Sequence, residues 1–163
     1  VEPAAETSKV LVETEKLLVA EAAQNRFPAM IVRAAGIYGP GRGYLLKQFL
    51  RGEALIEGDG GRVLNMIHRD DVVRAITTAL ERGKHGEIYN VADDEPVKEL
   101  EFFQWLAKTL NRPVPSFSTE PASRKRGLTN KRVSNRKLRQ ELGCELQYPN
   151  FRVGYGALIA QRL

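Results

Sequence analysis

Residues 27–43 read FPAMIVRAAGIYGPGRG, an apolar run that changes abruptly to glycine. Residues 29–32 are apolar without alternation, which is typical of a strand buried on both faces in a parallel sheet flanked by helices. Glycine and proline then crowd residues 36–43, which predicts a loop, and residues 44–50 carry apolar side chains at helical spacing. This stretch therefore predicts a strand, a loop and a helix.

The glycines of this loop also match a phosphate-binding pattern. They follow the spacing G-x-x-G-x-G over residues 36–41, and Glu57 or Asp59 follows about 20 residues on, as in a dinucleotide-binding turn. However, Pro40 has no N–H to offer a phosphate, and the bulky Tyr38 stands where the backbone should approach closely. We therefore do not expect this loop to bind a cofactor pyrophosphate.

The rest of the chain predicts an α/β protein. Apolar stripes at helical spacing alternate with short apolar runs and with glycine turns. We expect helices over residues 5–25, 72–82, 96–110 and 135–142, a strand over residues 88–91, a hairpin of residues 54–56 and 63–67 around the turn 58–61, and a C-terminal tail, residues 148–163, that packs back on the body.

The composition fits a single globular core. The chain has 163 residues, of which 42% are hydrophobic and 28% charged, and no apolar run approaches the roughly 20 residues of a membrane span. Its single cysteine, Cys144, allows no intramolecular disulfide and fits a reducing compartment, so we expect a cytoplasmic protein without a membrane partner. With two histidines and one cysteine, no metal site is expected.

Four blocks of sequence carry a family resemblance. RAAGIYGPG (33–41) resembles R-P-x-x-V-Y-G-P-G, IHRDDVVRAI (67–76) resembles I-H-V-D-D-x-x-x-A-I, GEIYNVADDEP (86–96) resembles G-x-x-Y-N-V-x-D-x-x-P, and KLRQELG (137–143) resembles K-L-x-x-E-L-G. In this order the blocks are similar to the second half of the extended short-chain dehydrogenase/reductases, the NAD(P)-dependent epimerase/dehydratase family. The resemblance covers roughly residues 3–155.

The resemblance implies the C-terminal part of a Rossmann-like doubly wound parallel sheet plus a small α/β substrate-binding subdomain. Residues 1–43 and 67–95 would belong to the Rossmann part, and residues 44–66 and 96–163 to the substrate-binding lobe. The family's glycine-rich turn and first strands should precede Val1. We therefore expect the chain to be the C-terminal part of a longer protein.

The resemblance places the family's Y-x-x-x-K pair on the helix of residues 5–25. Lys9 could take the position of the lysine that binds the nicotinamide ribose, but Ala5 stands where the proton-donating tyrosine is expected. Because alanine has no proton to give, either the register differs or the chain is an atypical member. The same helix resembles the family's dimer-forming element, so a homodimer through residues 5–25 is a possible assembly.

Cofactor and substrate contacts are implied around the central loop. In the complete protein, Ala35 and Gly36 are expected to approach the nicotinamide of NAD or NADP through their backbone. The candidate substrate-binding residues nearby are Tyr38, Arg42, Arg62 and Asn65, although each polar one could also be an ordinary surface side chain.

Leu64 marks a departure from the nucleotide-sugar epimerases. The family has an arginine at this position that binds the substrate pyrophosphate, and a leucine cannot make charge-assisted contacts to phosphate. A nucleoside-diphosphate sugar is therefore a weaker expectation than the family resemblance alone suggests.

His68, Asp70 and Asp71 precede the helix of residues 72–82. Asp70 or Asp71 is well placed to cap this helix by accepting its unpaired N–H groups. A carboxylate metal or acid/base site would need more ligands than this neighbourhood supplies. We expect His68 to be a hydrogen-bonded side chain at a strand end rather than a catalytic base.

A basic cluster covers residues 124–139. Three interpretations are open: a solvated surface, a subsite for an anionic small molecule that includes Lys125 and Arg126, or a nucleic-acid contact. Aromatic side chains are not interleaved as a stacking platform would require, so nucleic acid is the least favoured partner.

Two classes of function follow from these features. The first is the substrate-binding half of an NAD(P)-dependent epimerase, dehydratase or reductase that acts on a small hydroxylated or sugar-like substrate. The second is a non-catalytic module that binds a ligand or a partner.

The two expected parallel strands, residues 29–32 and 88–91, would leave apolar faces uncovered, so we expect the upstream segment or a second copy to cover them. We expect no tight NAD(P) binding by this chain alone, since the pyrophosphate turn is missing.

Overall fold

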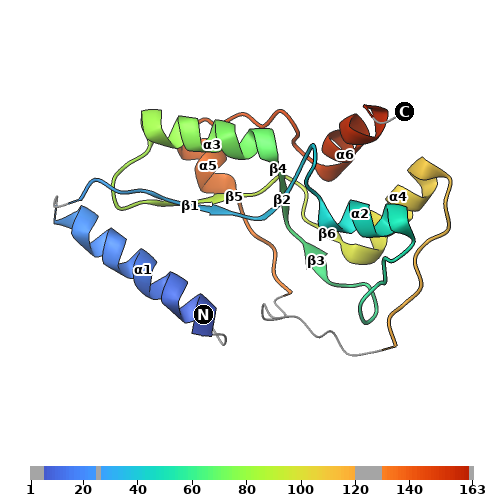
Figure 1. The fold of residues 1–163 in the computed structure, drawn as a ribbon. Coiled ribbons are helices and arrows are strands. Elements are labelled where there is room, and N and C mark those ends of the chain that lie inside the picture. The colour runs from blue at the N-terminus through green and yellow to red at the C-terminus, as the bar shows by residue number, and fades with distance from the viewer. Residues whose placement is uncertain (1–5, 25–26, 120–129, 162–163) are drawn as a thin grey trace.

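The computed structural model describes residues 6–24, 27–119 and 130–161, and Figure 1 shows their arrangement. Helices and strands alternate along the chain. In order they are α1 (Glu6–Ala23), β1 (Ile31–Ala34), β2 (Gly36–Tyr38), α2 (Tyr44–Arg51), β3 (Val63–Leu64), β4 (Met66–His68), α3 (Arg69–Arg82), β5 (Ile88–Val91), β6 (Val97–Lys98), α4 (Glu99–Leu110), α5 (Arg136–Glu141) and α6 (Phe151–Ala160).

Two parallel strand pairs form the centre of the fold. β1 pairs with β5, so that Ile31 lies opposite Ile88, and β2 pairs with β4, so that Tyr38 lies opposite His68. β3 and β6 form a separate antiparallel pair. The predicted α/β class with parallel strands is confirmed.

Helices pack on these strands in two groups. α3 and α5 lie on one side of β1 and β5, where they share a core cluster with the strands, and α1 lies on the opposite side (Figure 1). A second cluster, built around aromatic side chains, joins α2, α4 and α6 to β2, β3 and β6. Its largest buried members are Tyr38, Phe102, Phe103, Phe151 and Tyr155.

The strand and loop expected over residues 29–43 have other boundaries in the structure. β1 covers Ile31–Ala34, and its side chains are half-buried or exposed rather than buried on both faces, because α1 does not cover them fully. Residues 36–38, expected in the loop, form β2 because they pair with β4. The remaining turn is closed by mutual backbone hydrogen bonds between Gly39 and Arg42, at 2.9 and 3.0 Å.

The predicted hairpin of residues 54–56 and 63–67 is wrong. Its two segments pair elsewhere: β3 pairs with β6, β4 pairs with β2, and Ile56 forms an isolated bridge with Phe117. The helix expected from Pro96 begins at Glu99, since residues 97–98 first join β3 as a strand. In both cases a distant segment supplies the pairing partner.

The other predicted elements are confirmed with small shifts at their ends. The helices expected at residues 5–25, 44–50, 72–82 and 135–142 are α1, α2, α3 and α5, the strand at residues 88–91 is β5, and the tail packs back as α6 with Phe151 and Tyr155 buried. No helix of the described ranges has the length and apolar character needed to cross a membrane.

Candidate substrate cleft

A cleft of about 320 Å³ opens between β2, β3, β4 and the start of α2. Its lining comes from four separate segments of the chain. The lining residues are Gly36, Ile37, Tyr38, Gly43, Tyr44, Leu45, Arg62, Val63, Leu64, Asn65, Met66 and Tyr155. Four residues singled out in the sequence, Gly36, Tyr38, Arg62 and Asn65, therefore lie in one cleft.

Glycines shape the edge of the cleft where β2 leads into α2. Gly39 and Gly43 have φ angles of 152° and 144°, which side chains disfavour. A Cβ at Gly43 would only make ordinary contact with Tyr38 and Tyr155, so the backbone angle rather than lack of space requires glycine. This turn places Tyr44 at the edge of the cleft, where its side chain is 69% exposed.

Arg62 lines the cleft and forms ion pairs with two glutamates. Its Nη2 donates a hydrogen bond to Oε1 of Glu99, and its Nε lies 3.7 Å from Oε2 of Glu57. Glu99 is the first residue of α4 and is only 1% exposed. Its second oxygen accepts the Glu57 N–H at 3.3 Å. The cation of Arg62 is therefore balanced by carboxylates of this chain.

Asn65 fastens a distant segment to the cleft. Its Nδ2 donates to the carbonyl of Lys131 at 2.8 Å, and its Oδ1 accepts the Val133 N–H at 2.7 Å. Asn130 accepts the Val63 N–H in the same way, at 2.9 Å. These bonds hold residues 130–133 along β3 and the start of β4. The Asn65 amide therefore stabilises the position of this segment.

Tyr38 forms the buried end of the cleft wall. Its ring stacks on Tyr155 with centroids 4.2 Å apart and meets the edge of His68 at 5.3 Å. Its hydroxyl is buried and has no hydrogen-bond partner among the described residues. Burial, with a smaller effect of the nearby Asp93, raises the pKa of both tyrosines well above the ordinary value. They are neutral rings near pH 7.

Asp93 follows β5 and is buried behind these tyrosines. Burial raises its pKa to about 8, and only one of its oxygens accepts a hydrogen bond, a long one of 3.3 Å from the Glu95 N–H. Its carboxyl is therefore mostly protonated near pH 7. Asp93 does not line the cleft, so its proton does not face that space.

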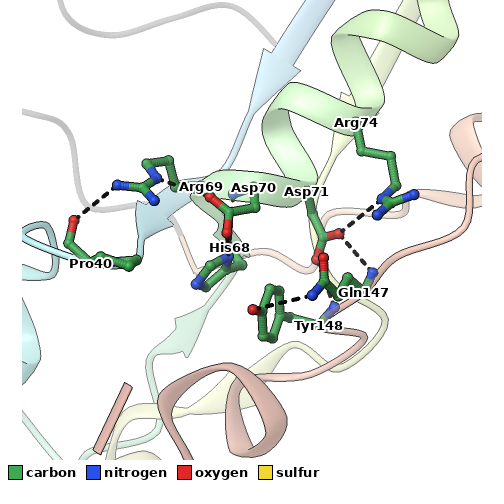
Figure 2. A network of polar contacts seen from close by, with 8 residues as sticks. All are labelled: Pro40, His68, Arg69, Asp70, Asp71, Arg74, Gln147 and Tyr148. Carbon is green, nitrogen blue, oxygen red and sulfur yellow. Dashed lines mark hydrogen bonds and ion pairs between the residues drawn. The ribbon is translucent and has the colours of Figure 1, made fainter. Parts of the chain in front are cut away.

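His68 begins α3 at the point where β4 ends (Figure 2). Its Nδ1 accepts the Asp70 N–H at 3.2 Å, which makes the imidazole the N-cap of the helix. Burial lowers the pKa of His68, because the charged imidazolium would lose its hydration there, and the neutral ring is the form that can accept this hydrogen bond. The prediction that Asp70 or Asp71 caps this helix was wrong, because His68 takes that place.

The two aspartates have different roles (Figure 2). Asp70 is partly exposed and accepts a hydrogen bond from Arg69 at 3.0 Å. Asp71 is fully buried, and its two oxygens accept the backbone N–H groups of Gln147 and Tyr148 at 2.7 and 2.8 Å. Asp71 thus anchors the segment before α6 and holds Tyr148 against His68, with ring centroids 3.8 Å apart. Its hydrogen-bond partners therefore belong to a distant segment and are not the N–H groups of α3 that a cap would bond.

The remaining predicted site residues that the structure describes lie outside the cleft lining. Lys9 is exposed on α1 and pairs with Glu6 at 2.7 Å. Ala35 is half-buried and donates its N–H to Val91, and Arg42 is exposed in the turn after β2. Ala5, Lys125 and Arg126 fall outside the described residues.

Sequence reasoning missed several residues that build the site. Glu99 was part of an expected helix but not of the cleft, and Tyr155 belonged to a tail without an assigned role. The expected capping pattern at Asp71 gave no sign of its contact with Tyr148. An acid in the first turn of a helix is common, because it complements the helix dipole, so the sequence carried no local signal that Glu99 pairs with Arg62.

Comparisons with known proteins identify related sequences. The NAD dependent epimerase/dehydratase family matches residues 7–92. Protein YeeZ of Escherichia coli (strain K12) is 35% identical over 121 residues, which are 74% of this chain and 41% of YeeZ. A 3-diazoavenalumate denitrifying reductase of Streptomyces sp is 28% identical over 170 residues, covering 93% of this chain and 53% of the relative.

Solved structures share the fold. The crystal structure of dTDP-glucose 4,6-dehydratase from Bacillus anthracis str. Ames in complex with NAD superposes with a TM-score of 0.79 at 20% identity, covering 98% of this chain and 52% of that chain. The chain thus spans about half the length of the relatives that it matches.

Proposed function

The chain belongs to the NAD dependent epimerase/dehydratase family, and on this premise we propose that it forms the substrate-binding part of an NAD(P)-dependent enzyme. The observation that carries the proposal is the cleft itself. Tyr38 comes from one segment and Arg62 and Asn65 from another; all three were singled out from the sequence and line the same space as Gly36. The proposed substrate is small and hydroxylated or sugar-like, and it lies in this cleft.

The described residues fit the nicotinamide end of the cofactor but not its pyrophosphate. The Gly36 backbone is exposed, so a flat ligand can reach it. On its other side there is no room for a ligand, because even a Cβ at Gly36 would lie 3.1 Å from the Asn65 carbonyl oxygen. In the turn after β2, the N–H groups of Gly39 and Arg42 already bond within the turn. NAD(P), when bound, exchanges a hydride with the substrate. We propose that polypeptide outside these 163 residues holds its phosphates.

The two core clusters support the proposed division of the chain. The cluster around β1, β5 and α3 corresponds to the Rossmann part, residues 1–43 and 67–95. The aromatic cluster around α2, α4 and α6 corresponds to the substrate-binding lobe, residues 44–66 and 96–163. Two elements cross this division. α5 packs on β5 although it lies in the second range, and Tyr38 of β2 belongs to the aromatic cluster although it lies in the first.

The described part of the basic cluster gives little support for a nucleic-acid contact. In its described part, Lys137 pairs with Glu87 and Arg139 lies 3.4 Å from Asp94. These pairs reduce the positive charge available to a polyanion. We propose no nucleic-acid partner.

The experiment that tests the proposed function is a cleft variant of the complete enzyme. We expect Tyr44→Ala to lower kcat/KM about tenfold, because this ring lines the proposed substrate cleft and is 69% exposed, so its removal should affect binding more than the core. Phe27→Ala, at another exposed aromatic side chain, which lies outside the lining, should leave kcat/KM unchanged. Reduction is followed by nicotinamide absorbance, and epimerisation or dehydration, which return the hydride and leave that absorbance unchanged, by NMR of substrate and product, with a panel of nucleotide sugars, aromatic aldehydes and aromatic ketones.

A specific feature favours a second candidate, the non-catalytic binding module. If Lys9 takes the position of the family's lysine, Ala5 stands where the proton-donating tyrosine is expected. If the complete protein binds a ligand in the cleft but turns over no panel member with NAD(P), this second function replaces the first. If Tyr44→Ala and Phe27→Ala behave alike in an active enzyme, the cleft is not the substrate site.

Further polypeptide is proposed to cover the apolar faces left open in this chain. Val10, Leu11 and Leu17 on α1 are 60–66% exposed, and Val73 and Leu80 on α3 are exposed as well. The proposed partners are the upstream segment of the same protein and a second copy of the chain through the helix of residues 5–25. Each would bury surface that water otherwise contacts.

The chain alone is therefore expected to self-associate at micromolar concentrations, as measured by sedimentation. If α1 is the contact, the variant Leu11→Lys, Leu17→Lys should sediment as a monomer, while Val73→Lys, Leu80→Lys should not. A wild-type chain that is a monomer and binds no apolar dye would contradict the proposal.

A further inference from the structure

The cleft contains one basic side chain among the residues that line it, and that side chain is already paired. Arg62 donates to Glu99 and lies near Glu57, while all other lining residues are uncharged. Since Glu99 is 1% exposed, water cannot replace Arg62 as its partner. A phosphate that drew Arg62 away would leave a buried carboxylate unpaired, which is strongly unfavourable.

The rest of the lining offers few hydrogen-bonding groups, of which the Tyr38 hydroxyl, unpartnered among the described residues, is neutral and buried. Both ends of the Asn65 amide are bonded to residues 131 and 133. Leu64 and Met66 present buried apolar side chains, and Leu45 packs beside them. Phosphate oxygens would lose their hydration here without gaining equivalent partners.

The cleft is instead suited to a flat ring. Tyr38 and Tyr155 supply stacked neutral rings on one wall, and Tyr44 supplies an exposed ring at the edge. Aromatic rings favour offset or edge-on contact with one another. A volume of about 320 Å³ lies at the small end of ligand sites, enough for one or two rings.

On the premise that the proposed function is right, we infer that the substrate group bound beside Arg62 and Leu64 is an uncharged aromatic ring, and that phosphate groups are excluded from this part of the cleft. The buried pair of Arg62 and Glu99 then serves selectivity: it keeps a cation in the wall without offering it to an anion. The cleft would discriminate against phosphate because the lining that the structure describes offers no free cation to bind it, and in favour of an aromatic ring because the ring fits the apolar lining.

The two methionines make this inference measurable. Met66 lines the cleft, whereas Met30 packs in the other core cluster, so carbon-13 labelled methyl groups report the cleft and a reference site separately. We expect phenol to shift the Met66 signal saturably through its ring current, with a dissociation constant of about 1–10 mM, and to leave Met30 unchanged. Inorganic pyrophosphate up to about 10 mM should shift neither signal.

Two variants test the role of the ion pair. Glu99→Gln removes the charged partner of Arg62. In this variant pyrophosphate should shift the Met66 signal, with a dissociation constant at least tenfold lower than in the wild type. Should that variant unfold, Arg62→Met combined with Glu99→Leu removes both charges and should keep the phenol response.

The outcomes separate this inference from the proposed function. A wild-type Met66 signal that responds to pyrophosphate, with the response lost in the double variant, would show that Arg62 binds phosphate; the inference fails and the cleft remains the substrate site. A Met66 signal that responds to neither probe overturns both the inference and the proposed place of the substrate.

Discussion

Replacing Gly154 by alanine is expected to destabilise the fold by about 3 kcal/mol, because the new methyl group would overlap a buried aromatic ring. A Cβ at Gly154 would lie 2.7 Å from Cζ of Tyr38. Tyr38 cannot move away, since Tyr155 stacks on one face and His68 meets it from another direction. Because this ring is also the cleft wall, the substitution should disturb ligand binding as well.

Gly156 in the same helix provides the matched control. A Cβ there meets nothing within 4 Å, so Gly156→Ala should stabilise α6 by about 0.5–1 kcal/mol through helix propensity alone. Urea unfolding of both variants, followed by the fluorescence of Trp105, compares them directly. Equal free energies of unfolding for the two variants would mean that Tyr38 does not pack against α6 as described.

Asp71→Ala is expected to destabilise the protein by about 3 kcal/mol, more than the loss of a helix cap. The change removes the acceptor of two backbone N–H groups, those of Gln147 and Tyr148, at a fully buried position. Each buried donor left without a partner costs about 1–3 kcal/mol. Asp71→Asn keeps one acceptor oxygen and should lose roughly half as much.

The neighbouring Asp70 is the control for this prediction. Its carboxylate is 44% exposed and pairs with Arg69 on the surface, so Asp70→Ala should change the free energy of unfolding by no more than about 0.5 kcal/mol. Thermal melts of the three variants are the measurement. Similar losses at positions 70 and 71 would indicate that both aspartates act only on the helix dipole of α3.

Local patterns in the sequence predicted most elements of the fold. The family resemblance inferred from four blocks is confirmed by the match over residues 7–92. Helices α1, α2, α3 and α5 and strand β5 followed from apolar periodicity and glycine stops, since these signals lie within a few residues of one another. The hairpin around Gly60 failed because β3 pairs with β6, a strand that is too short to show a pattern of its own.

The candidate site was predictable as a place but not as a set of contacts. Arg62 and Asn65 lie in the cleft, yet their partners Glu99 and Val133 are 37 and 68 residues away along the chain. Asp71 resembles a cap from its position before an apolar stripe, but its acceptor role is decided by a segment 76 residues further on. Pairings of this kind depend on tertiary packing, which local spacing does not encode.

The central claim is that this chain carries the substrate cleft while other polypeptide holds the cofactor phosphates. The most direct measurement is calorimetric titration of the 163-residue chain with NADH and NADPH, repeated after the residues encoded upstream are added as a second chain. We predict that the chain alone binds neither cofactor more tightly than about 100 μM, and that the complemented protein binds one of them with a micromolar dissociation constant. Micromolar or tighter binding by the chain alone would contradict the account, because the turn over residues 39–43 would then have to hold the pyrophosphate.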